Sequence, residues 1–450
     1  MLHVALGLPP LRTGGLTRYC VDLMEAQARG GFKVSLLYPG RFLPGKTVVK
    51  SHRHGDIQLY EVVNPLPVPL TCGVGDPRPF IADCDNPEAY RGLLEEVEPD
   101  IIHVHSYQGI HKEFFDIAAR NRMPIVFTTH DYYPICPRCT LVDRFEEACE
   151  GPASERCAAC NAGIGMTLHK SMIMQSGVYA KLKGSRILSL IAARVKQNMS
   201  SGGGSAAIEQ PANASMGDYR ALLDYNRSVV SAFDLIVSNS LVSEQIYRRY
   251  YPNKSFRLVP GTHAGLSRRE HAECRRKSDE TPRIAYFGGR KAYKGYETLM
   301  TACRLLHEEG VEFQLDLYGD DYEQPQGLPE VTCGGRISPE KVRGILREHD
   351  VVVVPSIYRE TCGFVVLEAL CEGVAVVCSD AVGAADLVEP DRVFKAGVAS
   401  DLAIKLKDAC ENRNIPVSVS DDYPITMNQQ IYLLKRIYHS LIREVSYESK

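Results

Sequence analysis

The sequence predicts an α/β protein made of two doubly wound domains, each with a mainly parallel sheet. Strand-like apolar runs alternate with stretches of helical period along almost the whole chain, and this alternation is typical of parallel strands joined by crossover helices. A polar stretch, Ser267–Glu280, interrupts the series. The length of 450 residues suits two or three domains with ample core.

Apolar runs that alternate with helical stretches are expected to form the strands. In the first half these runs are His3–Leu8, Val34–Leu37, Ile57–Val62, Ile101–His105, Ile125–Thr129 and Leu235–Ser238. In the second half they are Arg283–Phe287, Gln314–Tyr318, Asp350–Pro355 and Val374–Cys378. Ligands of doubly wound sheets bind at the carboxyl ends of the strands. Polar residues that directly follow these runs are therefore the first candidates for a functional site.

Composition excludes several classes of protein. A formal charge of −3 argues against a general nucleic-acid binder. The N-terminal residues lack a basic region followed by a long apolar core, and no apolar run is long enough to span a bilayer. Without a secretory signal, the 15 cysteines are expected to be mainly reduced thiols. We therefore expect a cytoplasmic protein.

The segment after Val351–Val354 carries the strongest functional signal. The valine run predicts a buried strand, and a helix is expected to begin close to Gly363. The first N–H groups of a helix have no carbonyl partner, and the helix dipole adds positive charge there. We expect the N–H groups of Gly363, Phe364 and Val365 to bind an anion such as a phosphate.

Two glutamates, Glu360 and Glu368, flank this helix start. Glu368 lies about one and a half turns into the helix, where it is placed to accept hydrogen bonds from the ribose of a nucleotide whose diphosphate sits on the helix end. Glu360, in the preceding loop, would face the group beyond the phosphates. The alternative is that the two residues have no binding role and are an acid near a helix start and a solvated helix glutamate. The preceding strand, Pro355-Ser356 and Gly363 disfavour this alternative.

A diglycine, Gly14-Gly15, joins the first expected strand to the first expected helix. Glycines at a helix start let backbone N–H groups meet a phosphate, although a tight turn explains a lone diglycine equally well. The loop lacks the Gly-x-Gly-x-x-Gly spacing, so a dinucleotide fingerprint is not supported.

A basic loop, Arg290–Gly295, follows the expected strand Arg283–Phe287. Beside a departing diphosphate, Arg290, Lys291 and Lys294 would neutralise the negative charge that grows on the phosphates. A short basic run is more often a solvated turn.

His130 ends the expected strand Ile125–Thr129, at the edge of the sheet where ligands bind. An isolated histidine at a strand end is more often a packed or hydrogen-bonded side chain than a catalytic one.

Together these motifs resemble the donor-site signatures of retaining glycosyltransferases of the GT-B fold, and of the family-four (glycosyl transferases group 1) enzymes in particular. The resemblance rests on Glu360-x7-Glu368 with Gly363 between them, on the Gly-Arg…Lys-Gly pattern of the basic loop, on the diglycine and on the segment around His130. It implies two Rossmann-like domains that face each other across a cleft.

The resemblance also implies roles for single residues. Glu360 would contact the donor sugar, Glu368 would hold the ribose, and His130 would contact the sugar and help to stabilise an oxocarbenium-like transition state. The catalytic set is then His130, Glu360, Arg290 and Lys294, and the donor-binding set is Gly14, Gly15, Gly363, Phe364, Val365 and Glu368. No cofactor or catalytic metal is needed if the helix dipole and the cations carry the leaving-group charge.

The expected domain boundaries follow from the motifs and from the family. An N-terminal Rossmann-like acceptor domain covers 1–265 and contains a cysteine-rich insert at about 132–165 and a basic helical segment at about 166–200. A linker at 266–280 leads to a C-terminal Rossmann-like nucleotide-sugar domain at 281–426. A last helix, 427–450, is expected to cross back and pack on the N-terminal domain, as in GT-B enzymes.

Two Cys-x-x-Cys pairs, Cys136/Cys139 and Cys157/Cys160, have the spacing of a structural zinc site, with Cys149 between them. Disulfides, structural thiols and an iron–sulfur cluster stay open as alternatives. Similar glycosyltransferases carry a comparable insert in which the cysteines matching Cys136, Cys149, Cys157 and Cys160 recur. The resemblance therefore implies that these four hold the metal, with Cys139 as an alternate ligand.

The stretch from Cys157 to Ile208 contains no acidic residue, while lysines and arginines alternate with apolar residues. A basic amphipathic helix can lie on an anionic membrane as a peripheral contact. It can equally cover a domain core with a solvated cationic face.

The resemblance implies transfer of a sugar, with retention, from a nucleotide-diphosphate sugar to a hydroxyl of a glycan, glycolipid or small-molecule acceptor. Surface polysaccharide, glycolipid or other glycoconjugate synthesis is the expected setting. The alternatives are a nucleotide-sugar epimerase of the same fold and a non-catalytic sugar-nucleotide-binding scaffold.

Overall fold

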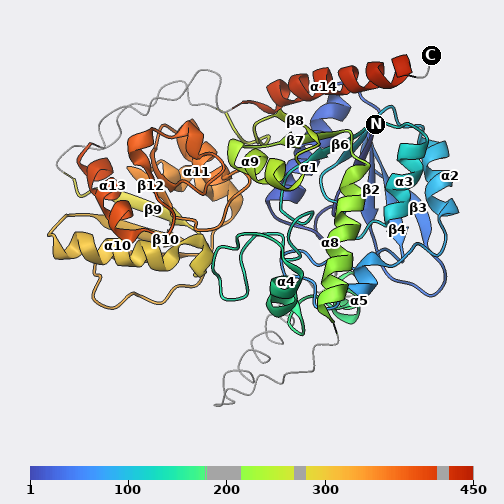
Figure 1. Ribbon diagram of the computed structural model, residues 1–450. Coiled ribbons are helices and arrows are strands. Elements are labelled where there is room, and N and C mark those ends of the chain that lie inside the picture. Colours follow the sequence, from blue (N-terminus) through green and yellow to red (C-terminus); the bar gives the residue numbers. More distant parts are fainter. Residues whose placement is uncertain (178, 180–213, 268–279, 413–424, 449–450) are drawn as a thin grey trace. The chain divides into compact units, whose positions relative to one another are not determined.

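The computed structural model describes residues 1–177, 179, 214–267, 280–412 and 425–448, which form two compact units (Figure 1). The first unit comprises Met1–Cys139, Gly151–Ile236 and Lys435–Lys450, and the second comprises Thr140–Glu150 and Val237–Leu434.

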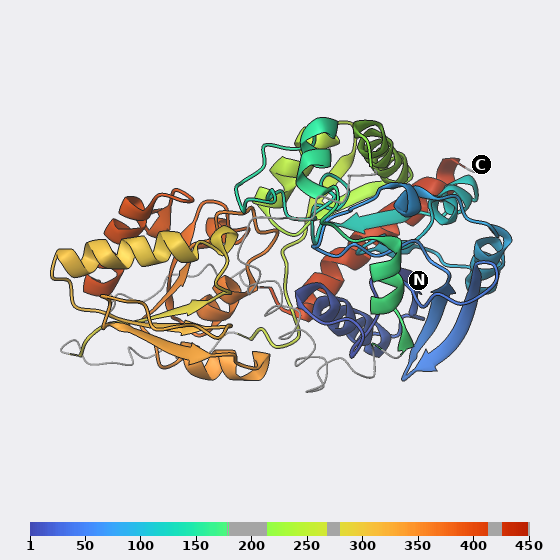
Figure 2. The same ribbon diagram turned by 90° about the horizontal axis from the view of Figure 1, so that it is seen from below.

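The first sheet has eight strands in the order β3-β4-β2-β1-β5-β6-β7-β8. In this order the strands are β3 (Val48–His54), β4 (Ile57–Val63), β2 (Ser35–Pro39), β1 (Leu2–Val4), β5 (Ile102–Val104), β6 (Ile125–Thr128), β7 (Leu235–Ser238) and β8 (Ser255–Leu258). β1 pairs in parallel with β2 and β5, β2 with β4, and β5 with β6. β3 is antiparallel to β4, and both lie in blue at one edge of the sheet in Figure 2.

Helices flank this sheet, and aromatic side chains fill the core beneath them. The helices are α1 (Gly15–Arg29), η1 (Arg78–Ile81), α2 (Glu88–Val97), α3 (Lys112–Arg120), α4 (Ser154–Asn161), α5 (Leu168–Met174), α8 (Met216–Ser231) and α9 (Leu241–Tyr250). Phe115 of α3, Phe127 of β6 and Phe233 after α8 stack or meet edge to face with ring centroids 5.3–5.5 Å apart. These contacts hold the carboxyl end of β6, and the residues that follow it, in a rigid setting.

The second sheet is parallel and has six strands in the order β11-β10-β9-β12-β13-β14. Its elements are β9 (Arg283–Phe287), η2 (Ala292–Lys294), α10 (Tyr296–Glu308), β10 (Gln314–Tyr318), β11 (Val331–Gly335), α11 (Pro339–Leu346), β12 (Val351–Val354), α12 (Phe364–Cys371), β13 (Ala375–Ser379), η3 (Ala385–Leu387), η4 (Pro390–Arg392), β14 (Val393–Phe394) and α13 (Ala399–Glu411). The last helix, α14 (Met427–Glu448), begins in the second unit and ends in the first.

The central strand β12 is buried on both faces. Val351 and Val353 belong to the core formed with α10 and α13, whereas Val352 belongs to the core formed with α12. A strand covered on both faces reads as a continuous apolar run, and this explains why four valines in a row mark the centre of the sheet.

Local sequence signals start several of the helices. Ser215 caps α8 in a reciprocal capping box with Asp218, Ser240 caps α9, and Thr167 caps α5. Side-chain oxygens at these positions satisfy N–H groups that the helix leaves without a partner.

The expected α/β class with two Rossmann-like folds is confirmed, and every expected strand is present with shifts of a few residues at its ends. Four strands were missed. β3 is an exposed edge strand of mixed polarity, and β8 is mostly exposed, so neither has an apolar run. In β11 the buried Val331 is followed by small and polar residues, and β14 has only two residues. These strands are set by pairing with their neighbours and not by local sequence.

Parts of the predicted linker and basic segment, 268–279 and 180–200, lie outside the described residues. β7 and β8, which the sequence assigned to the first domain, complete the first sheet, although by their contacts most of their residues belong to the second unit. None of the helices within the described residues has the length and apolar character needed to cross a membrane.

Candidate functional site

The turn between β12 and α12 is built on a glycine that no other residue can replace without strain. Gly363 precedes α12 with φ of 93°, in the left-handed region. A Cβ atom added there would lie 2.7 Å from Cγ1 of Val382. The first turn of α12 contains no acidic residue. No acidic side chain of the first turn therefore offsets the positive end of the helix dipole, and anion binding there stays a prediction.

Lys294 and Glu360, both predicted catalytic residues, form an ion pair. Nζ of Lys294 donates to Oε1 of Glu360 at 2.8 Å, and Oγ of Ser356 donates to the same oxygen. Nζ also lies 4.7 Å from the centre of the Tyr358 ring. The ammonium group is thus held by a carboxylate and by an aromatic face.

A close backbone approach brings these two residues together. Gly295 has φ of 76°, and a Cβ atom added to it would lie 1.7 Å from the carbonyl oxygen of Pro355. The N–H groups of Ile357 and Tyr358 both donate to the carbonyl oxygen of Tyr293, at 2.9 and 3.2 Å. The basic loop therefore packs directly on the loop that carries Glu360.

Lys294 stays protonated in this pair. Burial by itself would lower the pKa of Lys294, but the charge of Glu360 and the phenol of Tyr358 outweigh it and raise this pKa above its ordinary value. A permanent cation beside the start of α12 is suited to a ligand that carries more negative charge than the carboxylate of Glu360 does.

Glu368 lies in the second turn of α12 and is buried. Its Oε1 atom is 3.2 Å from Nε2 of His263, too poorly aligned for a hydrogen bond. The other ring nitrogen of His263 accepts a hydrogen bond from the N–H of Gly265. His263 also meets the Phe364 ring edge to face, with centroids 5.5 Å apart. The contact adds to the site a residue that sequence reasoning missed, because β8, the strand before it, has no apolar run to mark it.

Arg290 does not join the Lys294–Glu360 pair among the contacts that the structure describes. Its guanidinium lies 3.8 Å from Glu323 and 5.9 Å from the centre of the Tyr296 ring, and 53% of its side chain is exposed. Of these two predicted catalytic cations, Lys294 is therefore the one that the structure pairs with Glu360.

The predicted phosphate loop of the first unit has open space around it. Gly14 precedes α1 with φ of 112°, and a Cβ atom added there would meet nothing within 4 Å. The positive φ angle of Gly14 therefore favours glycine, but no neighbouring atom would clash with a side chain there. Like α12, α1 has no acidic residue in its first turn and no side-chain cap, so the predicted role of Gly14 and Gly15 is sterically open.

His130 follows β6 and is partly buried, and burial lowers its pKa to about 3. Its Nε2 atom lies 3.2 Å from Nδ1 of His105. Its ring also lies against Tyr19 of α1, with centroids 4.7 Å apart. His130 is therefore a neutral, oriented ring and not a mobile surface histidine.

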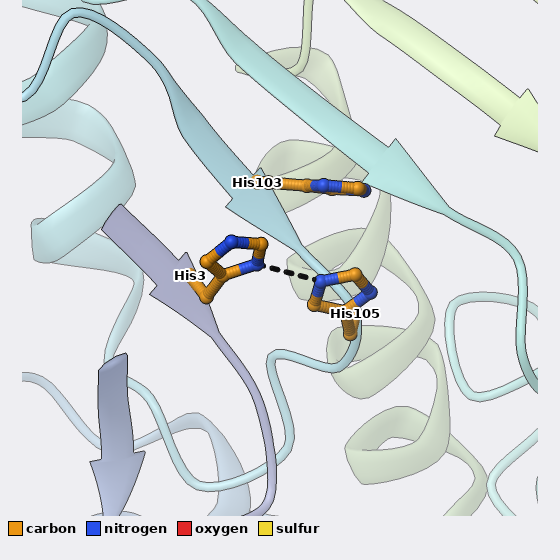
Figure 3. Close-up of side chains that lie close together, drawn as sticks. All are labelled: His3, His103 and His105. Carbon is orange, nitrogen blue, oxygen red and sulfur yellow. Dashed lines mark hydrogen bonds between the residues drawn. The ribbon is translucent and has the colours of Figure 1, made fainter. Parts of the chain in front are cut away.

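Behind His130 lies a buried group of three more histidines, His3, His103 and His105 (Figure 3). Nδ1 of His3 is 2.9 Å from Nε2 of His105, and Nε2 of His3 is 2.8 Å from Oε1 of Gln27. The sequence singled out only His130, because the other three look like strand residues until the sheet brings β1 beside β5.

The predicted zinc ligands are divided between elements. Cys157 and Cys160 lie on α4, Cys136 lies in the loop after β6, and Cys149 falls in the segment that belongs to the second unit. Cys139, the alternate ligand, donates its thiol proton to the carbonyl oxygen of Leu70 at 2.7 Å, and burial raises its pKa.

Within the described residues, the group of histidine, cysteine or carboxylate ligand atoms that lie within 4.8 Å of one another is His3, His103 and His105, and it contains no cysteine. Cys149 belongs to the second unit, whereas Cys136, Cys157 and Cys160 belong to the first. No chemical step is derived from a metal, and the cysteine set stays a prediction.

Two protein-family models match separate parts of the chain. Glycosyltransferase Family 4 matches residues 13–160, and Glycosyl transferases group 1 matches residues 281–412. The first stretch contains the diglycine and His130, and the second contains Lys294, Glu360 and Glu368. A search of curated proteins finds no significant match.

Solved structures resemble the chain over nearly its full length. Sucrose-phosphate synthase from Thermosynechococcus elongatus has a TM-score of 0.52 at 16% identity and covers 98% of this chain and 99% of its own. The α,α-trehalose 6-phosphate synthase from Burkholderia multivorans has a TM-score of 0.55 at 12% identity, and the match covers 100% of this chain and 98% of that one. Anabaena Alr3699/HepE in complex with UDP has a TM-score of 0.51 at 14% identity, and the match covers 97% of this chain and 99% of that one. At these identities the likeness shows the shared fold.

Proposed function

Because the chain is a glycosyltransferase of the GT-B type, similar to family-four (group 1) enzymes, we propose that it is a retaining enzyme that moves a hexose from a nucleoside-diphosphate sugar to an acceptor hydroxyl. The observation that carries this proposal is the Lys294–Glu360 ion pair beside the start of α12, with Glu368 in the second turn of the same helix. Cation, carboxylates and helix end lie within one unit, so the proposal does not depend on how the units are arranged.

The diphosphate of the donor would lie on the first N–H groups of α12, at Gly363, Phe364 and Val365. As the bond between sugar and phosphate breaks, negative charge grows on the phosphate, and Lys294 supports it. A preorganised cation stabilises such charge without having to reorganise during the reaction. Glu360 holds Lys294 in the free protein, and the incoming diphosphate would share this cation.

Glu368 would accept hydrogen bonds from the ribose hydroxyls. Its neighbour His263, with Nε2 at 3.2 Å from Oε1 of Glu368, would lie beside this carboxylate. Arg290 would act as a second cation once it leaves Glu323, a weak exposed pair that costs little to break.

His130, with Gly14 and Gly15, would complete the reaction from the first unit. A neutral imidazole can accept a hydrogen bond from a sugar hydroxyl, whereas an imidazolium would oppose the positive charge of an oxocarbenium-like transition state. The low pKa of His130 supports this role.

A uridine nucleotide is the first donor to test, because a solved structure with the same fold is a complex with UDP. For the acceptor we propose a glycan, glycolipid or small molecule with a free hydroxyl, used in surface polysaccharide or glycoconjugate synthesis.

The test is a panel of uridine, guanosine and adenosine diphosphate sugars, first by thermal shift and then with acceptors in a transfer assay. A bound donor raises the unfolding temperature, and transfer should release nucleoside diphosphate only with an acceptor present. Proton NMR of the product should show the anomeric configuration of the donor. Inversion would overturn the retaining mechanism. Epimerised donor without acceptor would identify an epimerase, and tight binding without turnover a scaffold.

A further inference from the structure

The buried histidines behind His130 form a chain of hydrogen bonds that ends on this residue. The chain runs from Gln27 of α1 through His3 of β1 and His105 after β5, with distances of 2.8, 2.9 and 3.2 Å. Each distance lies within hydrogen-bond range, so one partner of each pair donates and the other accepts. His3 and His105 are at most 1% exposed.

The rings of this chain are neutral. Burial lowers the pKa of His3 to about 3 and that of His105 well below its ordinary value. A neutral imidazole carries one N–H donor and one acceptor nitrogen. A proton assigned to one ring therefore dictates the proton on the next ring.

Gln27 sets the direction of the chain. Its Oε1 atom can only accept, so Nε2 of His3 carries the proton and Nδ1 of His3 is an acceptor. Nε2 of His105 must then donate to His3, which leaves Nδ1 of His105 as an acceptor. The last link follows in the same way, with Nε2–H of His130 donating to His105.

The amide of Gln27 could point the other way only by reversing every proton in the chain. Its Oε1 atom would then have to accept from the hydroxyl of Tyr438, which lies 3.5 Å from that end of the amide. This distance is too long for an O–H···O bond and suits only a weak N–H donor. The geometry therefore favours the orientation in which Gln27 accepts from His3.

The fourth histidine lies on a separate branch. Nδ1 of His103 is 2.7 Å from the hydroxyl of Tyr438, and its Nε2 atom is 2.7 Å from Oγ1 of Thr128. Among the hydrogen bonds of the described residues, this branch is linked to the chain through the 3.5 Å contact between Tyr438 and Gln27. The ring of His103 also packs against that of His105, with centroids 4.1 Å apart. It supplies a control that is equally buried but does not lead to His130.

A metal ion is a poorer explanation of the three clustered rings in Figure 3. Both nitrogens of His3, His103 and His105 already have hydrogen-bond partners. A metal would have to displace the 2.9 Å bond between His3 and His105 to obtain two ligands.

We propose that Gln27, His3 and His105 are positioning residues that hold His130 in its Nε2–H tautomer, so that Nδ1 of His130 is a hydrogen-bond acceptor. The tautomer of a functional histidine is set by the partner of its other nitrogen. The consequence for catalysis rests on the proposed function, in which His130 meets the donor sugar and accepts a hydrogen bond from one of its hydroxyls.

The direct test is a long-range ¹H–¹⁵N correlation spectrum of the full chain labelled with ¹⁵N-histidine. The His130 signals are identified by their loss in His130→Asn. We expect His3, His105 and His130 as Nε2–H tautomers, unchanged between pH 8 and pH 5. An Nδ1–H tautomer at His130, or titration of His130 in that range, overturns the proposal. This spectrum needs no substrate, so its result stands even if the proposed function fails.

Two variants separate positioning from general stability. Gln27→Met removes the acceptor that sets the direction, whereas Thr128→Val removes a buried hydroxyl from the other branch. In Gln27→Met we expect mixed tautomers at His130 and a fall in kcat of roughly 10- to 100-fold, the range for partners that orient a functional histidine, with little change in the donor KM. Thr128→Val should leave the His130 tautomer and kcat as in the parent. Equal losses of kcat in both variants would contradict a positioning role.

Discussion

The candidate site residues of the two units are held in opposite ways. In the first unit, four histidines lie neutral in a hydrogen-bonded network, and burial lowers the pKa of each. In the second unit, Lys294 and Glu360 form an ion pair, and the pKa of Lys294 is raised. A neutral network fixes geometry without attracting a counter-ion, whereas a cation beside a helix start attracts an anion. The comparison suggests that the first unit orients and the second binds charge.

The largest expected difference between the units is the loss of stability of the first unit at acidic pH. Histidines with a folded pKa below the unfolded value of about 6.5 bind protons mainly when the chain unfolds, so stability is full above pH 6.5 and falls as the pH decreases. Between pH 7 and pH 5 the loss is about 2 kcal/mol for a histidine whose folded pKa is about 3, as for His3 and His130, and His103 and His105 act in the same direction. Asp131, whose pKa burial raises to about 6, opposes them as one group.

Hydrogen exchange of amides in β1 and β5, corrected for its intrinsic pH dependence, measures this loss in the first unit alone. Amides of β12 in the second unit serve as the internal control. Protection in β1 that stays constant from pH 7 to pH 5 would mean that the histidines are not held neutral.

Gly295→Ala should separate crowding from backbone strain in the second unit. Gly295 and Gly310 have similar φ angles, 76° and 70°, but a Cβ atom at Gly295 would lie 1.7 Å from a carbonyl oxygen whereas one at Gly310 meets nothing within 4 Å. We expect Gly295→Ala to cost about 3 kcal/mol or more and Gly310→Ala about 1 kcal/mol, as measured by denaturant unfolding. Similar costs would show that the basic loop does not depend on this close approach.

Lys294→Ala tests whether charge at the second unit supports the reaction. Replacing a preorganised charge stabiliser should lower kcat by about a hundredfold or more. Lys341→Ala, at an exposed lysine of α11 in the same unit, is the matched control and should change kcat little. If Lys294→Ala raises only KM, the lysine binds the donor equally in the ground state and the transition state.

The two glutamates should separate binding from turnover. Glu368→Ala should weaken nucleoside diphosphate binding by about 1–3 kcal/mol, because a hydrogen-bond acceptor for the ribose is lost. Glu360→Gln should lower transfer with little change in nucleoside diphosphate affinity. Calorimetric titration of both variants checks this, and equal losses of affinity would place the two side chains differently from the account given above.

The cysteines offer the smallest effect on the reaction. From the sequence we expect about one zinc per chain in anaerobically purified protein, held by Cys136, Cys149, Cys157 and Cys160. Cys157→Ser should then lose the zinc and some stability but keep donor binding. Elemental analysis that finds no metal in the folded protein would contradict this set of zinc ligands.

The features predicted from the sequence are those that are local along the chain. The four valines of β12, Gly363 and both glutamates lie within one short stretch, so strand, turn and helix could be predicted together. Lys294 was found from its own loop, but its pairing with Glu360, 66 residues away, depends on Gly295 packing against Pro355.

Contacts made by folding explain what was missed. His3 and His105 become neighbours only because β1 pairs with β5, and the Gln27 amide joins them from α1. Nothing in the local sequence of a buried strand histidine reveals this. His263 meets Glu368 only once the segment after β8 lies beside α12 in the second unit.

The central claim is that the start of α12 binds the diphosphate of a sugar nucleotide. Hydrogen exchange with and without UDP, GDP and ADP tests it most directly, because protection can be read peptide by peptide. We predict that one nucleotide slows exchange across 290–295 and 356–368, and that Glu368→Ala weakens this protection. Nucleotide binding that leaves both segments unprotected, or no binding by any of the three, would contradict the account.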